Sequence, residues 1–406
     1  MKWTSLGFHT FIIFVRLSRE QATLIKEAFR ELMLSGEIKI IPYGEVPFWV
    51  MNEGDAYLKN RPAGYNITYN TKLSGIRKGI KWTLRISSSS KDFKEYTLEA
   101  QINPKILAGI IDYITAATKD DIKDIASLFN QEAQRISLGI PMFDQFQLKR
   151  VDYCINFHLL ELGIPSSTDQ TMRLFKRSNI PHNYNKVLFY NPIGRRMGSD
   201  DSSLYLKSKS VTIQCYDKYS QLQREYPDSP SLENARNILR FEVQCYYRKV
   251  YGMRRSYKDN LDPLPYNEFK EFFSKETCES VIRNYFDRVI MRGDYYPIKH
   301  SRNLILKCGF RGNRGQRMID TLNLVNPSRG GGGIHNAKSI LTGIELDNFK
   351  RGLLDLQTTM GINPVAIPSD WGIKHIPNLL DAYDKLSGNP TRSQYITAYD
   401  PHDDEI

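Results

Sequence analysis

The chain of 406 residues is 41% hydrophobic and 25% charged, which is typical of a folded globular protein and excludes a disordered or fibrous chain. At this length two or three domains are expected. Its 56 lysine and arginine residues outnumber its 45 acidic ones and leave a net charge of +11, which favours a polyanionic partner such as DNA or RNA, although a basic enzyme with another substrate would show the same balance.

The N-terminal segment begins with a strand and a helix. The apolar run FHTFIIFV at 8–15 is much shorter than the ~20 residues that cross a bilayer and lacks a signal-peptide cleavage pattern, so it predicts a buried strand and no membrane segment. Ser18 and Gln21 then form an S-x-x-Q capping box, which predicts a helix over 19–34.

The remainder of the N-terminal segment alternates strands and helices. Segments within 37–101 alternate apolar and polar residues, as half-buried strands do. Asn103-Pro104 opens a helical stretch over 104–136, predicted as two helices broken near 118–121. We expect 1–145 to form an N-terminal α/β region that packs with the rest of the fold.

The middle segment, 146–262, is predicted to hold a set of strands that each lead into a helix. The segment LKRVDYCINFHLL reads as a strand, and a helix over TDQTMRLF follows the caps Ser166 and Ser167. A hairpin is predicted over 203–216, with a short helix over 217–224 after it. NILRFEVQCYY is a further strand that runs directly into a helical segment.

The C-terminal segment, 263–399, is predicted to be mostly helical, and 400–406 is an acidic tail. The expected fold class is therefore α+β, with an antiparallel sheet flanked by helices and a helical C-terminal region.

The five cysteines, at 154, 215, 245, 278 and 308, include no CxxC pair. Their spacing excludes the usual zinc clusters and indicates no disulfide framework. A cytoplasmic location is the expectation, because the cytoplasm keeps thiols reduced.

Polar side chains share one face on each of three predicted strands. Strand alternation places Asp152, Asn156 and His158 on one face of RVDYCINFHLL. By the same rule Arg240 and Glu242 share a face in ILRFEVQC, as do Tyr216 and Lys218 in TIQCYDK. Such residues are costly within a sheet unless they are paired or bind a metal, so the pattern makes sense if the three strands are neighbours.

Together these residues would suit phosphodiester chemistry. Asp152 and Glu242 are hard oxygen ligands for Mg²⁺ or Mn²⁺. Tyr216 would be the nucleophile, and Lys218 would favour its phenolate or stabilise the transition state. The structural alternative is that the two acids form ion pairs, for example with Arg150 or Arg240, and that the tyrosine serves packing.

The same three segments carry a resemblance to a known family. RVDYCINF, CYDKYSQLQ and LRFEVQCYYRKVYG resemble, in this order, three segments of rolling-circle replication initiators, and the pattern is closest to that of the gene II/X replication proteins of filamentous phages. Plasmid initiators of the Rep_trans type and conjugative relaxases, all relatives of the HUH-type endonucleases, share the order. The strong part of the resemblance covers 148–253, and its matching residues are Arg150-Val151-Asp152, Tyr216-Asp217-Lys218 and Leu239-Arg240-Phe241-Glu242.

The resemblance implies a Rep-like nicking domain at 146–262. It implies that Tyr216 is the DNA-nicking nucleophile and that Asp152 and Glu242 bind the metal. Plasmid-type members often carry a second acid where this chain has Asn156, and the His-hydrophobe-His motif is only approximated by Asn156-Phe157-His158. His158 is therefore expected either as a third metal ligand or as a core or edge histidine.

Several basic residues are candidate DNA contacts. A helix after the third segment interleaves basic residues with Tyr246, Tyr247 and Tyr251, which would grip phosphates and stack unpaired bases, or else form a solvated helix face. The candidates are Arg150, Arg195, Arg196, Arg240, Arg248, Lys249, Arg254 and Arg255.

The sequence thus predicts an enzyme that nicks and closes one DNA strand at an origin to start rolling-circle replication. Its substrate would be single-stranded or hairpin origin DNA in a bacterial host cell. The host helicase would unwind the DNA, because the sequence contains no Walker motif, and the host polymerase would extend the nicked strand. A mobilisation relaxase with the same chemistry is one alternative, and a DNA-binding replication regulator without catalysis is another.

Overall fold

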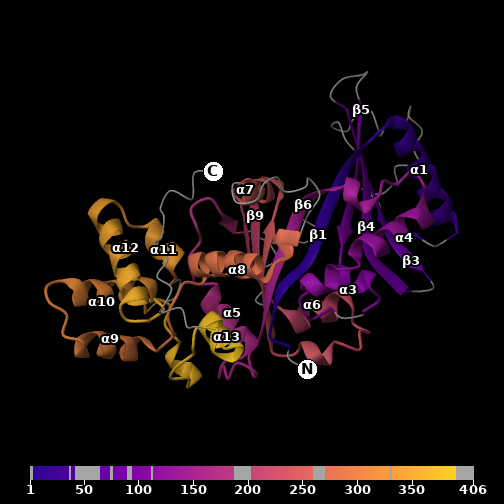
Figure 1. Ribbon diagram of the computed structural model, residues 1–406. Coiled ribbons are helices and arrows are strands. Elements are labelled where there is room, and N and C mark those ends of the chain that lie inside the picture. The colour runs from indigo at the N-terminus through magenta and orange to yellow at the C-terminus, as the bar shows by residue number, and fades with distance from the viewer. Residues whose placement is uncertain are drawn as a thin grey trace, which may run out of the picture.

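The computed structural model describes residues 3–35, 38–41, 65–73, 76–88, 94–110, 113–186, 203–258, 270–328 and 332–389. Within these residues the chain is α+β, with one antiparallel sheet flanked by helices and a C-terminal region made mostly of helices (Figure 1). The coarse fold class predicted from the sequence is therefore confirmed.

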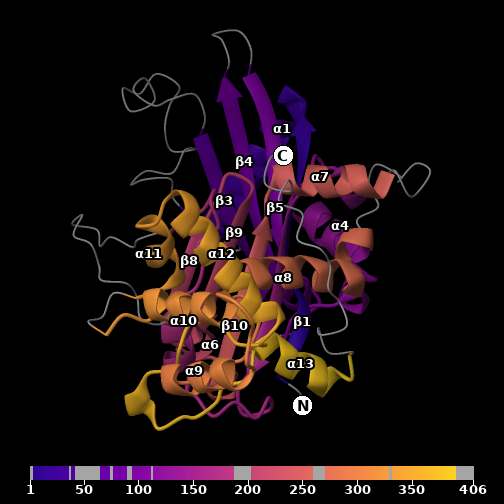
Figure 2. The same ribbon diagram turned by 90° about the vertical axis from the view of Figure 1, so that its left-hand side faces the viewer.

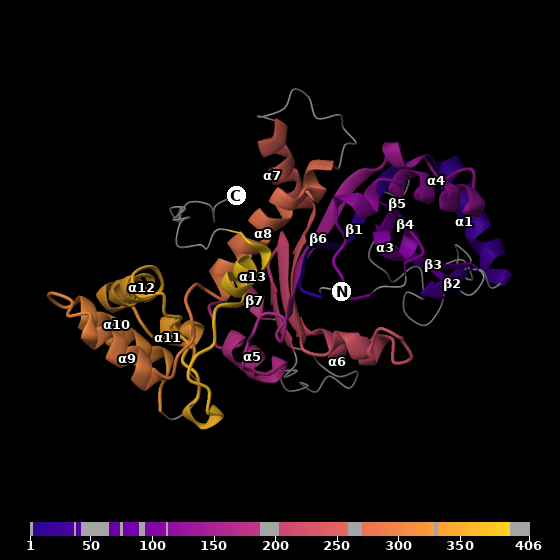
Figure 3. The ribbon, with the colours of Figure 1, turned by 60° about the horizontal axis from the view of Figure 1, so that its bottom comes forward.

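Ten strands of the described residues form a single sheet in the order β2-β3-β4-β5-β1-β6-β10-β9-β8-β7. Every neighbouring pair is antiparallel. Figure 3 shows the sheet curling between its central strands and its N-terminal ones. The strands are β1 (Ser5–Leu17), β2 (Ile38–Ile41), β3 (Tyr65–Leu73), β4 (Ile76–Ser88), β5 (Lys94–Ile102), β6 (Gln147–His158), β7 (Asn185–Lys186), β8 (Ser203–Lys207), β9 (Val211–Asp217) and β10 (Ile238–Cys245).

Strand β1 is the apolar run at the N-terminus, and it lies in the middle of the sheet. It pairs with β5 along one edge and with β6 along the other. Phe8, Phe11 and Ile13 are fully buried, so the buried strand expected at 8–15 is confirmed. The regions expected at 1–145 and 146–262 share this sheet.

The first helix begins where the capping box predicted. The backbone N–H of Gln21 donates to Oγ of Ser18, and that of Ser18 donates to Oε1 of Gln21, so each residue satisfies one free donor of the first turn. The helix, α1, runs over Arg19–Leu34.

The helical stretch predicted over 104–136 is wrong in its first half. Helix α3 (Pro104–Leu107) is a single turn, and a short 3₁₀ turn (Lys119–Ile122) precedes α4 (Ile125–Ile136). Gly109 follows α3 with φ +83°, a left-handed conformation that ends the helix. Ala117 is then extended and forms a bridge with Phe8 of β1, so a contact distant in sequence replaces the helix that local pattern favoured.

The middle segment follows the predicted order of elements. Helix α5 (Thr168–Phe175) is capped by Ser167, and β8 and β9 form the hairpin. β9 passes directly into α6 (Lys218–Glu225), and β10 is followed at once by α7 (Tyr247–Lys258).

Helices cover one face of the sheet, which we call the helix-covered face. Helix α8 (Lys275–Val289) lies across β1, β6 and β10, as Figure 2 shows. Its Phe286 ring contacts Phe157 of β6 and Phe241 of β10 at centroid distances of 5.6 and 5.2 Å. Towards the N-terminal strands, Trp82 of β4 packs with Phe129 of α4 in the same core.

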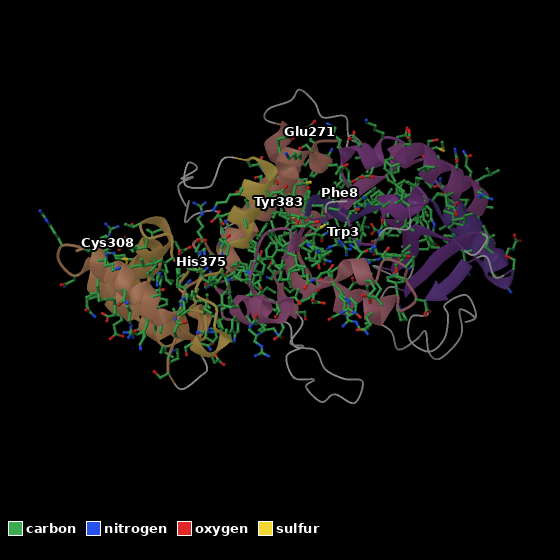
Figure 4. All side chains as sticks on the ribbon, turned by 90° about the horizontal axis from the view of Figure 1, so that it is seen from below. Trp3, Phe8, Glu271, Cys308, His375 and Tyr383 are labelled. Carbon is green, nitrogen blue, oxygen red and sulfur yellow. The ribbon has the colours of Figure 1, made fainter. Side chains whose placement is uncertain are left out.

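The C-terminal helices form a second, smaller apolar core beside the sheet. This core is built by α9 (Ile298–Lys307), α10 (Arg314–Val325) and α12 (Gly343–Thr358). The buried apolar residues of α11 (Ile334–Ser339) and α13 (Leu379–Ser387) belong to the main core instead. Helices α10 and α12 cross closely at Gly352, where an added Cβ would lie 2.0 Å from Oγ1 of Thr321. Figure 4 shows Cys308 and His375 in this part of the molecule, away from Trp3 and Phe8 of the sheet region.

Within the described residues no helix has both the length and the apolar character needed to span a membrane.

Candidate active site

Three segments far apart in the sequence meet on the face of the sheet opposite α8. Asp152 of β6 lies opposite Gln244 of β10, and Arg240 of β10 lies opposite Tyr216 of β9. Glu242 stands between these pairs on β10, and residues paired across an antiparallel ladder share a face. We call this surface the polar face. It brings together Tyr216, the candidate nucleophile, and both acids that the sequence singled out.

The phenol of Tyr216 contacts Glu242 directly. Its Oη donates to Oε2 of Glu242 at 3.1 Å, while Nε2 of Gln244 donates to Oε1 of the same carboxylate at 3.0 Å. Glu242 is buried, and Tyr216 is only partly so. The two hydrogen bonds fix the Glu242 carboxylate so that its Oε2 faces the phenol of Tyr216.

The surroundings of Tyr216 keep its phenol protonated at neutral pH. Burial raises the pKa of Tyr216 well above its usual value, and the negative charge of Glu242 adds to this rise. The charge of the Arg240 guanidinium acts in the opposite direction and favours the phenolate. The phenol already donates its hydrogen bond to a carboxylate, Glu242, which is a group able to accept a proton.

Asp152 is fixed by two hydrogen bonds that both end on its Oδ2. Oγ1 of Thr10 donates one, and Nη2 of Arg150 donates the other at 2.7 Å. Oδ1 is buried without a hydrogen-bond partner among the described residues. Burial raises the pKa of Asp152 to about 6, Arg150 opposes the rise, and the charge of Glu242 adds to it.

His9 of β1 is a member of this site that sequence reasoning missed. Its Nδ1 lies 3.9 Å from Oε2 of Glu242, and its side chain is 26% exposed. The β1–β6 register shifts at this residue, and such a bulge re-aims a side chain. Burial lowers the pKa of His9 well below its usual value, and nearby positive charges add to this, so its ring is neutral at pH 7. The available signal was a histidine inside the apolar run FHTFIIFV.

Arg240 is fully buried and is held by neutral oxygens. Its Nε donates to Oδ1 of Asn156 at 2.8 Å, and its Nη2 donates to the carbonyl oxygen of Ile114. Its Nη1 is buried without a hydrogen-bond partner in the described structure. Arg240 was a candidate DNA contact in the sequence, but here its guanidinium lies inside the protein, beside Tyr216.

The prediction that Lys218 shares a strand face with Tyr216 is wrong, because β9 ends at Asp217 and Lys218 begins helix α6. Lys218 is nevertheless buried near Tyr216. Its Nζ donates to Oε1 of Gln221 at 2.6 Å and lies 6.0 Å from the centre of the Tyr216 ring. Asp217 caps the helix by accepting from the backbone N–H of Ser220 at 2.7 Å. The cap ends β9 immediately after Tyr216 and thereby sets the position of the phenol.

His158 does not lie with the two acids. It ends β6, six residues and about 20 Å along the strand from Asp152. Its Nδ1 accepts from the backbone N–H of Glu161 at 3.2 Å, a contact that fits the core-histidine alternative.

The basic candidates fall into different environments. Arg150 pairs with Asp152, and Arg248 is exposed on α7. Nζ of Lys249 lies 6.0 Å from the ring of Tyr285, and Arg254 is half-buried. The loop with Arg195 and Arg196, and the side chain of Arg255, lie outside the described residues.

Comparison with known proteins identifies no relative of this chain. No protein-family model, no curated protein and no solved structure matches the chain.

Proposed function

We propose that the protein nicks and closes one strand of DNA, with Tyr216 as the nucleophile, and that it starts rolling-circle replication. The hydrogen bond of 3.1 Å between the Tyr216 phenol and the Glu242 carboxylate supports this most directly. It joins two segments that the sequence singled out separately, on strands that also carry Asp152. In this proposal β6, β10 and β9 are the centre of an HUH-like core.

The proposed step is a transesterification. Oη of Tyr216 attacks the phosphorus of the scissile phosphodiester while its proton passes to Oε2 of Glu242. A bond forms between phosphorus and the tyrosine oxygen, the bond to the 3′ oxygen breaks, and that oxygen leaves as a 3′ hydroxyl after taking a proton from water. The 5′ phosphate remains on Tyr216, so a second attack by a 3′ hydroxyl rejoins the strand.

Basic side chains near Tyr216 would stabilise the charge that develops. Arg240 favours the phenolate, and Nζ of Lys218 lies 6.0 Å from the centre of the same ring. Both are buried, and a buried charge interacts more strongly than one in water.

The residues present suit a divalent cation such as Mg²⁺ or Mn²⁺. Oδ1 of Asp152 lacks a hydrogen-bond partner among the described residues, and the Glu242 carboxylate and the neutral His9 ring lie on the same face. No group of three His, Cys, Asp or Glu side chains in the described part of the chain is placed to hold a metal, but Mg²⁺ commonly takes one or two carboxylates and completes its shell with water and phosphate oxygens. A bound cation would polarise the scissile phosphate.

One observation favours the non-catalytic alternative. Arg150 pairs with Asp152 at 2.7 Å, which is the structural ion pair considered from the sequence. A DNA-binding regulator would keep this pair and form no covalent link to DNA. A mobilisation relaxase, by contrast, would share the whole site and differ only in its origin and partners.

The experiment is a search for a covalent protein–DNA adduct. The protein is incubated with Mn²⁺ and a library of single-stranded circles of random sequence, denatured, and separated from unlinked DNA, and the captured junctions are sequenced. We expect adducts that share a short sequence and disappear in Tyr216→Phe. The control is Tyr219→Phe, three residues further on in α6, which should form adducts normally. Adducts that persist in Tyr216→Phe, or none with the unaltered protein, would refute the proposal.

A further inference from the structure

Helix α7 carries two neighbouring exposed aromatic side chains. Tyr247 and Tyr251 are 47% and 52% exposed, and they are the only aromatics among the exposed large hydrophobic residues of the described structure. Their rings lie 6.3 Å apart with an interplanar angle of 28°, and Phe14 of β1 meets the Tyr247 ring edge-on at 6.0 Å. We call these three residues the aromatic platform.

The platform lies on a helix of one charge sign. The sequence of α7, YRKVYGMRRSYK, contains five basic residues and no acid. Arg248, next to Tyr247, is exposed. A partner that brings both negative charge and flat apolar rings matches this surface, and unpaired nucleotides bring both.

The platform continues the polar face of the candidate active site. α7 follows β10 directly. Tyr247 is five residues after Glu242, which corresponds to about 16 Å of extended chain. Phe14 lies two residues beyond Ile12 on β1, and Ile12 pairs with Arg150 of the polar face. Tyr246 links the two parts, because its Oη donates to Oε1 of Gln244 at 3.3 Å.

A basic helix that simply faces solvent would explain the arginines of α7 but not its two exposed rings. Exposed lysines and arginines need no partner, whereas two neighbouring rings that are each about half exposed leave apolar surface unburied. A protein partner would equally bury rings, but a surface without any acid on its helix favours a polyanion over a mixed-charge protein surface.

We propose that the aromatic platform and Arg248 bind a single-stranded nucleic acid, with bases stacked on Tyr247 and Tyr251 and phosphates against the basic side chains. This deepens the proposed function by naming where the strand beside the nick would lie. Binding itself requires no nicking, so the two proposals are tested separately.

The test measures binding in the Tyr216→Phe protein with EDTA present, so that covalent linkage is excluded. Fluorescence anisotropy follows a labelled oligonucleotide of mixed sequence, single-stranded and then annealed to its complement. Tyr247→Leu combined with Tyr251→Leu keeps the apolar surface and removes the rings. We expect the single-strand Kd to rise about tenfold or more and the duplex Kd to change less than about twofold, because stacking on these rings needs unpaired bases.

Two further variants complete the test. Leu138→Ala combined with Ile344→Ala removes exposed apolar side chains elsewhere, 90% and 81% exposed, and should change neither Kd. Arg248→Ala should reduce the slope of log Kd against log salt by about 1, while exposed Arg351→Ala of α12 should leave it unchanged. Equal weakening of single strand and duplex by the double leucine variant, or no weakening of either while its thermal unfolding is normal, would overturn the proposal. The second result would point to a protein partner at this surface.

Discussion

Arg240 lies directly opposite Tyr216 in the β9–β10 ladder, and it is a fully buried cation whose hydrogen bonds end on neutral oxygens. Those oxygens belong to Asn156 and Ile114. A buried cation that donates to no carboxylate is costly, although Glu242 lies two residues away on the same face. The cost falls further if the neighbouring phenol ionises. The Arg240 charge therefore opposes the rise in the pKa of Tyr216 that burial and Glu242 cause, and it makes loss of the phenol proton less costly.

Arg240→Met should separate this role from stability. Met fills a similar volume without charge but leaves Oδ1 of the buried Asn156 without its donor, so the free energy of unfolding in urea should fall by about 1 to 3 kcal/mol. The rate of adduct formation should fall on the order of 10²-fold, as expected for the loss of one buried group that stabilises an oxyanion. Arg236→Met, an exposed arginine paired with Glu233, is the matched control. A normal adduct rate in Arg240→Met would exclude the role.

Glu242→Gln should remove the proton acceptor and keep the shape. The amide still accepts a hydrogen bond from the phenol but takes no proton at neutral pH, so the adduct rate at pH 7.5 should fall on the order of 10² to 10⁴-fold. The loss of the carboxylate charge also lowers the pKa of Tyr216 relative to the unaltered protein, so part of the rate should return as the pH rises. A pH–rate profile measures both effects, with Glu279→Gln on α8 as the control. A Glu242→Gln profile that overlays that of the unaltered protein would contradict the assignment.

Asp152 should make the folded state less stable as the pH rises. Its pKa in the folded protein is about 6, above its ordinary value of 3.8, so between these values the folded chain holds a proton that the unfolded chain has lost. Stability from this group is therefore full below about pH 4 and declines as the pH rises through about 6. The difference in unfolding free energy between the protein and Asp152→Asn should change by about 1 kcal/mol between pH 5 and 7.5.

The control for this experiment is Asp355→Asn. Asp355 pairs with Arg314 and Arg317, and these contacts lower its pKa despite burial, so it titrates below this pH window. The difference in unfolding free energy between Asp355→Asn and the unaltered protein should be constant between pH 5 and 7.5. A flat difference for Asp152→Asn as well would show that Asp152 titrates normally.

His9 and His158 should behave differently when each is changed to glutamine. His9 lies beside the Glu242 carboxylate, so His9→Gln should lower the adduct rate more than about tenfold. It should also raise the Mn²⁺ concentration that gives half of the maximal adduct rate. His158 accepts from the backbone at the far end of β6, so His158→Gln should change the rate less than about twofold. The reverse ranking would move the metal site to the end of β6.

Local pattern predicted the elements that build the site, because the information for them is local. Alternation in RVDYCINFHLL and ILRFEVQC identified both strands and the faces of Asp152 and Glu242. The change from strand to helix next to Tyr216 was predicted from the residue pattern, and the structure shows Asp217 as the helix cap. The meeting of these residues was a hypothesis that only the strand order could test.

What the sequence did not reveal depends on contacts distant along the chain. Nothing local indicates that β1 inserts between β5 and β6, so His9 was not connected with the site. The bridge between Phe8 and Ala117 likewise replaced a helix that the residues after Pro104 favour locally. Arg240 was expected to contact DNA or to pair with an acid, and its hydrogen bonds to Asn156 and Ile114 depend on segments distant along the chain.

The central position of β1 has a consequence for synthesis on the ribosome. Thr10 of β1 and Asp152 of β6 are hydrogen-bonded partners separated by 142 residues. At ordinary translation rates roughly 7 to 30 s pass between the emergence of the two strands. Throughout that interval one edge of a nascent apolar strand has no partner, so this chain should depend on holding chaperones and should aggregate when it is overproduced rapidly in their absence.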